Sequence, residues 1–208
     1  MTITDMQALT EVQRDALREV ANIGAGHAAT ALSTMTGTKI MISVPTITVC
    51  ALAELAPVIA EADELIALVP MEMSGSLHGH TILAFPLPTA HRLAGLMLRR
   101  DALAASVLSE LEASALTEAG NILAGAYMTA LSEFMRMTLL PSPPTLSVGP
   151  ARDVLTGTAL ETGHLGGFVF CVETEFMIDH ADGRLPGYFL LLPDSGSLGA
   201  MLTAVRVA

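Results

Sequence analysis

Hydrophobic positions between residues 9 and 33 recur with the period of an amphipathic helix. At about 100° per residue, one stripe is predicted to face the core. The stripe consists of Leu9, Val12, Ala16, Val20 and Ile23. Asp15, Glu19 and Asn22 share a second arc of about 60°, more than about 90° from the centre of that stripe. We therefore expect these three polar side chains to face solvent or a partner.

The same pattern returns 99 residues later. Residues 9–33 align without gaps to residues 108–132, and 13 of the 25 positions are identical, against roughly one in fifteen by chance. The matched pairs include Glu19 with Glu118, Asn22 with Asn121 and, farther along, Pro45 with Pro144. The sequence therefore predicts two copies of one unit, about 9–100 and about 108–208, joined in a single domain over 1–208.

Strand and helix patterns follow the long helix in each copy. The first copy predicts a strand run at 39–49, a short Ala-rich helix at 51–60, strands at 64–73 and 76–85, and a helix from Pro88 to Arg100. The second predicts strands at 145–148, 168–177 and 188–192 and a closing helix at 196–205. Turn residues at 74–76 and 182–184 are typical of hairpins.

These elements indicate an α+β fold with pseudo-twofold symmetry. We expect a central, mostly antiparallel sheet, with the two long motif-bearing helices on equivalent surfaces.

Composition narrows the class of protein. Hydrophobic residues make up 51% of the chain and charged residues 15%, which predicts a well-packed aliphatic interior. A net charge of −11 with ten Lys and Arg disfavours nucleic acid and anionic membranes as partners. Cys50 and Cys171 form no disulfide or zinc pattern, and the sequence shows no signal peptide or spanning segment. We expect a soluble, cytoplasmic protein.

The repeated Glu and Asn are the candidate chemistry. A carboxamide can donate and accept hydrogen bonds at once and so orient a water molecule, and a carboxylate can pair with a lysine. Small residues continue the same face, Gly26 and Ser33 in the first copy and Gly125 and Ser132 in the second, which leaves room for another surface. Exposed Glu and Asn are usually only a solvated face, and the residues alone leave both interpretations open.

Other candidate sites have weaker support. Gly24 and Gly26 lie within a helical pattern and lack the lysine of a phosphate loop. His78 and His80 could ligate a metal from one strand face, but no third ligand is evident nearby. His27 and His91 are lone helical histidines, more often packing or surface groups. Neither cysteine has a basic neighbour, and no serine elbow occurs.

The spacing of the motif resembles a known family. The signature of the CheC, CheX and FliY chemotaxis phosphatases is Asp or Ser, then Glu four positions later, Asn three positions after the Glu and Pro a further 23 positions on. It occurs twice, as Asp15/Glu19/Asn22/Pro45 and as Ser114/Glu118/Asn121/Pro144. The chain is thus identified as a CheC-like member, since CheC carries two motifs in a monomer, CheX carries one and dimerises, and FliY adds further segments.

The resemblance implies a function. The substrate would be the aspartyl phosphate of the response regulator CheY. Asn22 and Asn121 would orient the attacking water, and Glu19 and Glu118 would pair with the regulator's lysine. The divalent cation, Mg²⁺ as the expected ion, would belong to the regulator, so no cofactor or metal of this chain's own is predicted.

The resemblance also leaves an alternative. Members of the family bind CheD, a receptor deamidase, so this chain could be a non-enzymatic adaptor for it. The two copies differ, because Asp15 adds a negative charge that Ser114 lacks. That difference favours a more basic docking surface for the first helix.

Overall fold

Each copy of the repeat builds the same order of elements, helix–strand–strand–helix–strand–strand–helix. The computed structural model describes residues 11–51, 54–100, 107–163, 168–178 and 184–207. The first copy contains α2 (Glu11–Thr36), β1 (Ile40–Ile42), β2 (Thr46–Ala51), α3 (Ala56–Ile59), β3 (Leu65–Gly75), β4 (Gly79–Pro86) and α4 (Leu87–Met97). The second contains α5 (Glu110–Met135), β5 (Leu139–Pro141), β6 (Ser147–Pro150), α6 (Ala151–Glu161), β7 (Phe168–Ile178), β8 (Arg184–Pro193) and α7 (Ser195–Val207).

One antiparallel sheet unites the two copies. Its order is β1-β7-β8-β4-β3-β5, with β2 also on β7 and β6 also on β3. The two short strands of each copy therefore pair with the long strand of the other copy. β4 and β8, which are equivalent in the repeat, pair with each other in the middle of the sheet. This reciprocal exchange gives the pseudo-twofold arrangement, and the predicted α+β fold is confirmed.

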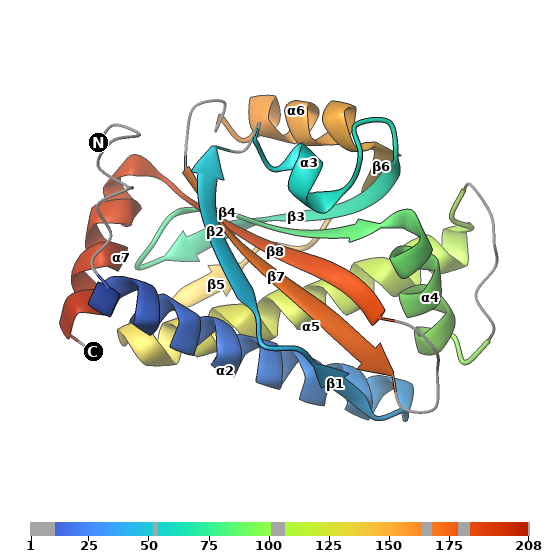
Figure 1. The fold of residues 1–208 in the computed structure, drawn as a ribbon, viewed down its shortest axis with the longest axis horizontal. Coiled ribbons are helices and arrows are strands. Elements are labelled where there is room, and N and C mark those ends of the chain that lie inside the picture. The colour runs from blue at the N-terminus through green and yellow to red at the C-terminus, as the bar shows by residue number, and fades with distance from the viewer. Residues whose placement is uncertain (1–10, 52–53, 101–106, 164–167, 179–183, 208) are drawn as a thin grey trace.

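Helices cover both faces of the sheet (Figure 1). α2, α5 and α4 lie on one face and share a large hydrophobic cluster with it. The short α3 and α6 lie on the opposite face over a second cluster. Two long helices on one face place the candidate residues of both copies on the same side of the molecule.

Several predicted boundaries were wrong. The expected strand at 39–49 is interrupted at 43–45, where the buried Pro45 separates β1 from β2. The expected helix at 51–60 is reduced to α3, and β5 and α6 were not predicted. In the hairpin pattern at 182–184, residues 182 and 183 lie outside the described part of the chain. Pro45 cannot donate a ladder hydrogen bond, which explains the break between the strands.

The predicted core stripe of the first helix was right at Val20 and wrong at the other described positions, and Leu9 lies outside the described residues. Val12 is exposed, and Ala16 and Ile23 are half-buried. The buried stripe is instead rotated toward smaller residues. It consists of Leu17, Val20, Ala21, Ala25, Ala28 and Leu32. α2 packs closely along α5, so alanines take the centre of the contact and leave the larger Val12 outside it.

Candidate functional site

The two Glu/Asn pairs lie on the outward faces of α2 and α5. Glu19, Asn22, Glu118 and Asn121 are all exposed, as predicted. Within the described part of the chain, their side chains form no hydrogen bond or ion pair with one another or with a neighbour. Asparagine occurs nowhere else in the 208 residues. The chain thus presents its two asparagines outward, each beside an exposed glutamate.

Helix geometry sets the arrangement of each pair. Residues three apart on a helix are neighbours, with Cβ atoms about 5–6 Å apart. Glu19 and Asn22 lie on the side of α2 that is roughly opposite the buried stripe through Leu17 and Ala21. The carboxylate and the carboxamide therefore point the same way and can meet one partner together.

Packing between α2 and α5 fixes how the two motif helices lie against each other. A Cβ atom added to Gly24 would lie 2.5 Å from Cδ1 of Tyr127 on α5. Tyr127 is held in turn by its hydroxyl, 3.0 Å from that of Thr174, and by stacking on Phe189 with ring centroids 4.4 Å apart. Gly24 is therefore a contact residue between the helices, and its place in the sequence needs no functional explanation.

Gly26 and Gly125 have no such structural cause. A Cβ atom added at either position would meet nothing within 4 Å. Each glycine lies one turn beyond its asparagine, and each costs its helix roughly 1 kcal/mol relative to alanine. The open space beside both asparagines is consistent with the predicted close approach of another surface.

The prediction that Ser33 and Ser132 belong to this open face was wrong. Both are half-buried and bind the strand that follows their helix. The backbone N–H of Ile40 donates to Ser33 Oγ at 2.9 Å, and the N–H of Leu139 donates to Ser132 Oγ at 3.1 Å. These equivalent bonds fasten β1 to α2 and β5 to α5. Each bond is a structural reason why serine occurs at this position in both copies. The sequence pattern alone could not distinguish this structural reason from a functional one.

The prolines of the motif lie away from its helix in the chain. Pro45 connects β1 to β2, and Pro144 connects β5 to β6. Each stands in the same link of its own copy, where it ends one short strand before the next begins. Their shared position indicates a turn requirement of the fold.

Charged neighbours distinguish the two sites. Arg18 Nη1 lies 3.1 Å from Asp15 Oδ1, and both side chains are exposed. At the equivalent places α5 has Ser114 and Thr117, and the Thr117 hydroxyl donates to the Ala113 carbonyl at 2.8 Å. Asp15 adds a charge that Ser114 lacks, but Arg18 balances it.

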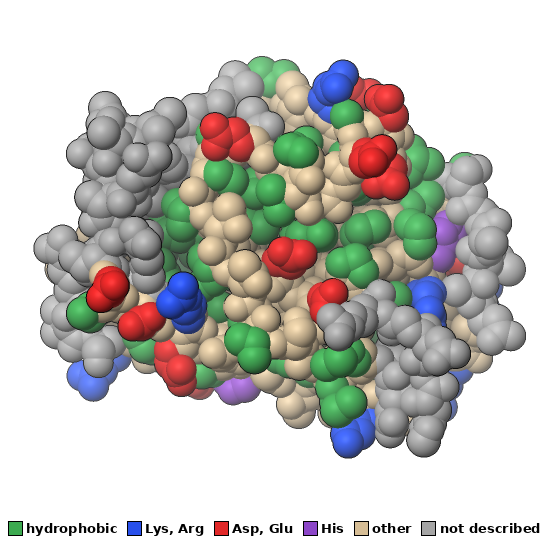
Figure 2. All heavy atoms as spheres, viewed as in Figure 1, with side chains coloured by type: hydrophobic (Ala, Val, Ile, Leu, Met, Phe, Trp, Pro, Cys, Tyr) green, Lys and Arg blue, Asp and Glu red, His purple; other side chains and the backbone are tan. Residues whose placement is uncertain are grey.

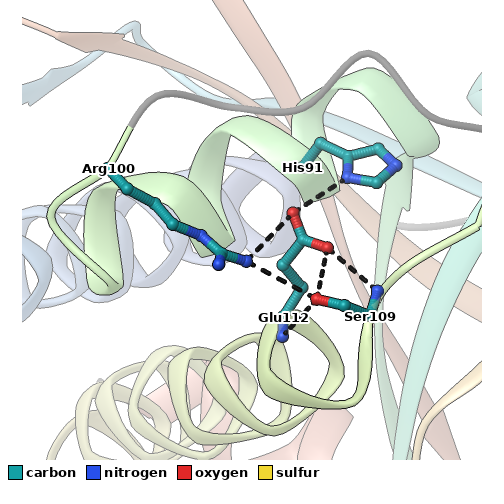
Figure 3. A network of polar contacts seen from close by, with 4 residues as sticks. All are labelled: His91, Arg100, Ser109 and Glu112. Atoms are coloured by element: carbon teal, nitrogen blue, oxygen red, sulfur yellow. Dashed lines mark hydrogen bonds and ion pairs between the residues drawn. The ribbon is translucent and has the colours of Figure 1, made fainter.

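A polar network around the buried Glu112, shown in Figure 3, was not predicted from the sequence. Ser109 caps the N-terminus of α5, and its N–H and hydroxyl donate to Glu112 Oε2 at 2.9 and 2.7 Å. Glu112 Oε1 lies 3.4 Å from His91 Nδ1 and 3.5 Å from Arg100 Nη2. The Ser-x-x-Glu spacing at 109–112 is the signal that could have revealed it.

The network is a structural anchor. The hydrogen bonds from Ser109, followed by His91, lower the pKa of Glu112 from 4.5 to about 2. His91 is buried, as expected for a packing residue, and its bond to Glu112 ties α4 to the start of α5. This carboxylate holds the motif helix in place from about two turns before Glu118.

The remaining candidates gain no support as sites. In the described part of the chain, no three His, Cys, Asp or Glu side chains gather to hold a metal. Burial raises the pKa of Cys50, and that of Cys171 to about 12, which makes both poor nucleophiles. In the face shown in Figure 2, the charged side chains of the described surface form a few small groups of mixed sign on a largely uncharged background. None of the described helices is both long and apolar enough to cross a membrane.

Comparison with known proteins agrees with two copies of one motif-bearing unit. A model of the CheC-like family matches residues 12–49 and 111–148, one segment in each copy of the repeat. The chain is 31% identical over 199 residues to the CheY-P phosphatase CheC of Bacillus subtilis, covering 95% of both proteins.

Solved structures show the same fold. FliY from Thermotoga maritima matches with a TM-score of 0.80 and 26% identity, over 96% of this chain and 98% of that one. A chain of the CheX–CheY complex with beryllium fluoride and Mg²⁺ from Borrelia burgdorferi matches with a TM-score of 0.50 and 19% identity, over 81% of this chain and 94% of that one. The second likeness shows the fold alone.

Proposed function

The chain belongs to the CheC-like family, and from that premise we propose that it hydrolyses the aspartyl phosphate of a chemotaxis response regulator, CheY-P. The observation that carries the proposal is the pair of outward Glu/Asn sites on α2 and α5, whose side chains bind no other side chain among the described residues. Each site could engage a regulator from the same side of the molecule. One chain therefore supplies two sites.

In the proposed mechanism, the regulator brings the phosphoryl group, its lysine and its divalent cation. The carboxamide of Asn22 or Asn121 enters the regulator's site, accepts a hydrogen bond from water and holds the water in line with phosphorus. The water oxygen bonds to phosphorus, and the bond from phosphorus to the aspartate oxygen breaks. The products are inorganic phosphate and the free carboxylate of the regulator.

Glu19 and Glu118 position the docked regulator. In the free protein each carboxylate is exposed to water and has no partner among the described side chains. When the regulator's lysine approaches, the ion pair forms in a contact that excludes water, where charge pairing is stronger than at an exposed surface. Positioning of this kind is the main requirement of phosphoryl transfer.

Phosphate release from CheY-P tests the proposal. The wild-type chain should accelerate release over spontaneous decay, and Asn22→Ala together with Asn121→Ala should return it to the spontaneous rate. Glu19→Gln with Glu118→Gln should also lose most of the activity. Glu133→Gln is the matched control, because Glu133 is an exposed glutamate on α5 four turns beyond Glu118. A wild-type chain that gives no acceleration would refute the proposal.

Binding of the receptor deamidase CheD is a separate prediction. An adaptor would retain CheD after both asparagines are changed to alanine, because those side chains serve the phosphatase step. A pull-down with the cognate CheD measures this directly. Failure of the wild-type chain to retain CheD would remove the adaptor function and leave the phosphatase proposal intact.

A further inference from the structure

The Glu/Asn face begins with an exposed aliphatic residue in both copies. Val12 is 67% exposed and Leu111 is 56% exposed, although both are large hydrophobic side chains on long, well-packed helices. They stand 99 residues apart, at equivalent positions of the repeat. The sequence pattern assigned Val12 to the core, so its outward position is a finding of the structure.

These residues belong to the same stripe as the proposed catalytic residues. The stripe follows spacings of three and four residues, the pattern that lines one side of a helix. In α2 it consists of Val12, Asp15, Glu19, Asn22 and Gly26, and in α5 of Leu111, Ser114, Glu118, Asn121 and Gly125. Val12 is about 20° from Glu19 around the helix and about 10 Å from it along the axis. A partner that covers Glu19 and Asn22 lengthwise therefore reaches Val12.

Exposure alone does not single out these positions. Met41 and Leu140 are also equivalent in the repeat, and they are 43% and 55% exposed. Their neighbours Ile40 and Leu139 pack into the cluster beneath α2 and α5. Because successive strand residues point to opposite faces, Met41 and Leu140 point away from the motif helices. Of these two repeated pairs of described residues, Val12 and Leu111 are the pair continuous with the Glu/Asn face.

We propose that Val12 and Leu111 are the apolar anchors by which each motif face docks the response regulator, against an apolar patch beside the regulator's phosphorylation site. The inference rests on the proposed function and adds the docking surface to it. Covering the aliphatic side chain removes it from water, which favours the docked state. The anchor contacts the regulator before, during and after hydrolysis, so it contributes to binding and leaves the chemical step unchanged.

The test compares two matched double variants. Val12→Ser with Leu111→Ser removes the anchors, and Met41→Ser with Leu140→Ser removes equally repeated, similarly exposed side chains from the other side. Thermal unfolding followed by circular dichroism checks that both variants fold. We expect the anchor variant to raise KM for CheY-P about tenfold with kcat within about twofold of wild type. The control variant should leave both constants unchanged.

A binding measurement separates this inference from the proposed function. The probe is CheY loaded with beryllium fluoride and Mg²⁺, titrated against each variant. The Kd should rise about tenfold for the anchor variant and stay unchanged for the control. A wild-type chain that binds this probe without hydrolysing CheY-P refutes the phosphatase proposal and leaves the anchor inference standing. An unchanged Kd in the anchor variant, equal weakening by the control, or no binding by the wild-type chain overturns the inference.

Discussion

The motif helices α2 and α5 present the same outer stripe, but they pack against each other with different side chains. At the contact, α2 has Gly24 and Ala28 where α5 has Leu123 and Tyr127. The added Cβ of Gly24 would lie 2.5 Å from Tyr127, so the small residue on one helix makes room for the large one on the other. The two copies thus differ in side-chain volume on their inner faces, where small residues of one helix meet large residues of the other. Both outer faces have kept Glu and Asn. At the inner positions the combined volume of the facing side chains is constrained, whereas at the outer positions the identity of each residue is constrained.

The largest effect should come from separating the two copies. The chain cut into 1–100 and 107–208 should yield two halves that show no cooperative thermal unfolding by circular dichroism. The reason is the strand exchange, since β1 and β2 pair with β7 while β5 and β6 pair with β3. Each half alone would expose the sheet edge that the other covers. A cooperative transition in either half would show that one copy is an independent unit.

A substitution at the contact between α2 and α5 should have the next largest effect. Gly24→Ala should destabilise the protein by about 2 kcal/mol, because Tyr127 is held on both sides and cannot retreat from a new methyl group. The measurement is urea unfolding.

Gly26→Ala is the matched control for this substitution. It places the same methyl group two residues away in open space, and it should stabilise the helix by about 0.5–1 kcal/mol. Equal effects of the two substitutions would refute the assignment of Gly24 to packing.

Acid stability should depend on the second helix through Glu112. The pKa of Glu112 in the folded protein is about 2, below its ordinary 4.5, so its stabilising contribution is complete above about pH 4.5 and is lost as the pH falls toward 2. Glu112→Gln should cost about 2 kcal/mol at pH 7 and flatten the dependence of unfolding free energy on pH in that window. Exposed Glu110→Gln is the control. An unchanged pH profile in Glu112→Gln would contradict the network.

The sequence predicted the features that recur. The repeat, the antiparallel sheet and the outward orientation of Glu19 and Asn22 follow from periodicity and from identities between the copies. These signals are strong because the helical period and the two-residue strand period each recur several times within one element. The catalytic roles of the four site residues and the division at about residues 100 and 108 stay predictions.

Features that depend on contacts between distant segments could not be predicted in this way. The core face of α2 was misplaced because alanine and glycine are compatible with either side of a helix, and contacts with other elements, such as that of Gly24 with Tyr127, decide which side is buried. The role of Ser33 depends on a backbone N–H of β1. The pairing of His91 with Glu112 joins residues 21 apart on two helices. Hydrophobic pattern carries none of this information.

The smallest expected effect concerns the difference between the two sites. Asp15 gives the first site a charge that Ser114 lacks, which predicted a preference for a more basic docking surface. Arg18 lies 3.1 Å from Asp15, so the pair is neutral, as are Ser114 and Thr117 at the equivalent positions of α5. The pair is exposed, and its net contribution should be small.

The two sites should therefore be close to equal. Asn22→Ala and Asn121→Ala should each retain about half of the wild-type rate of phosphate release, because each removes one of two independent sites with matched local charge. Arg18→Thr sharpens the comparison, since it leaves Asp15 unbalanced beside Glu19. In the Asn121→Ala background, which retains only the first site, this change should lower KM for a regulator with a basic docking surface and should do so less at high salt. Loss of all activity in one single asparagine variant would instead identify the other helix as an inactive copy whose outer face is retained for binding.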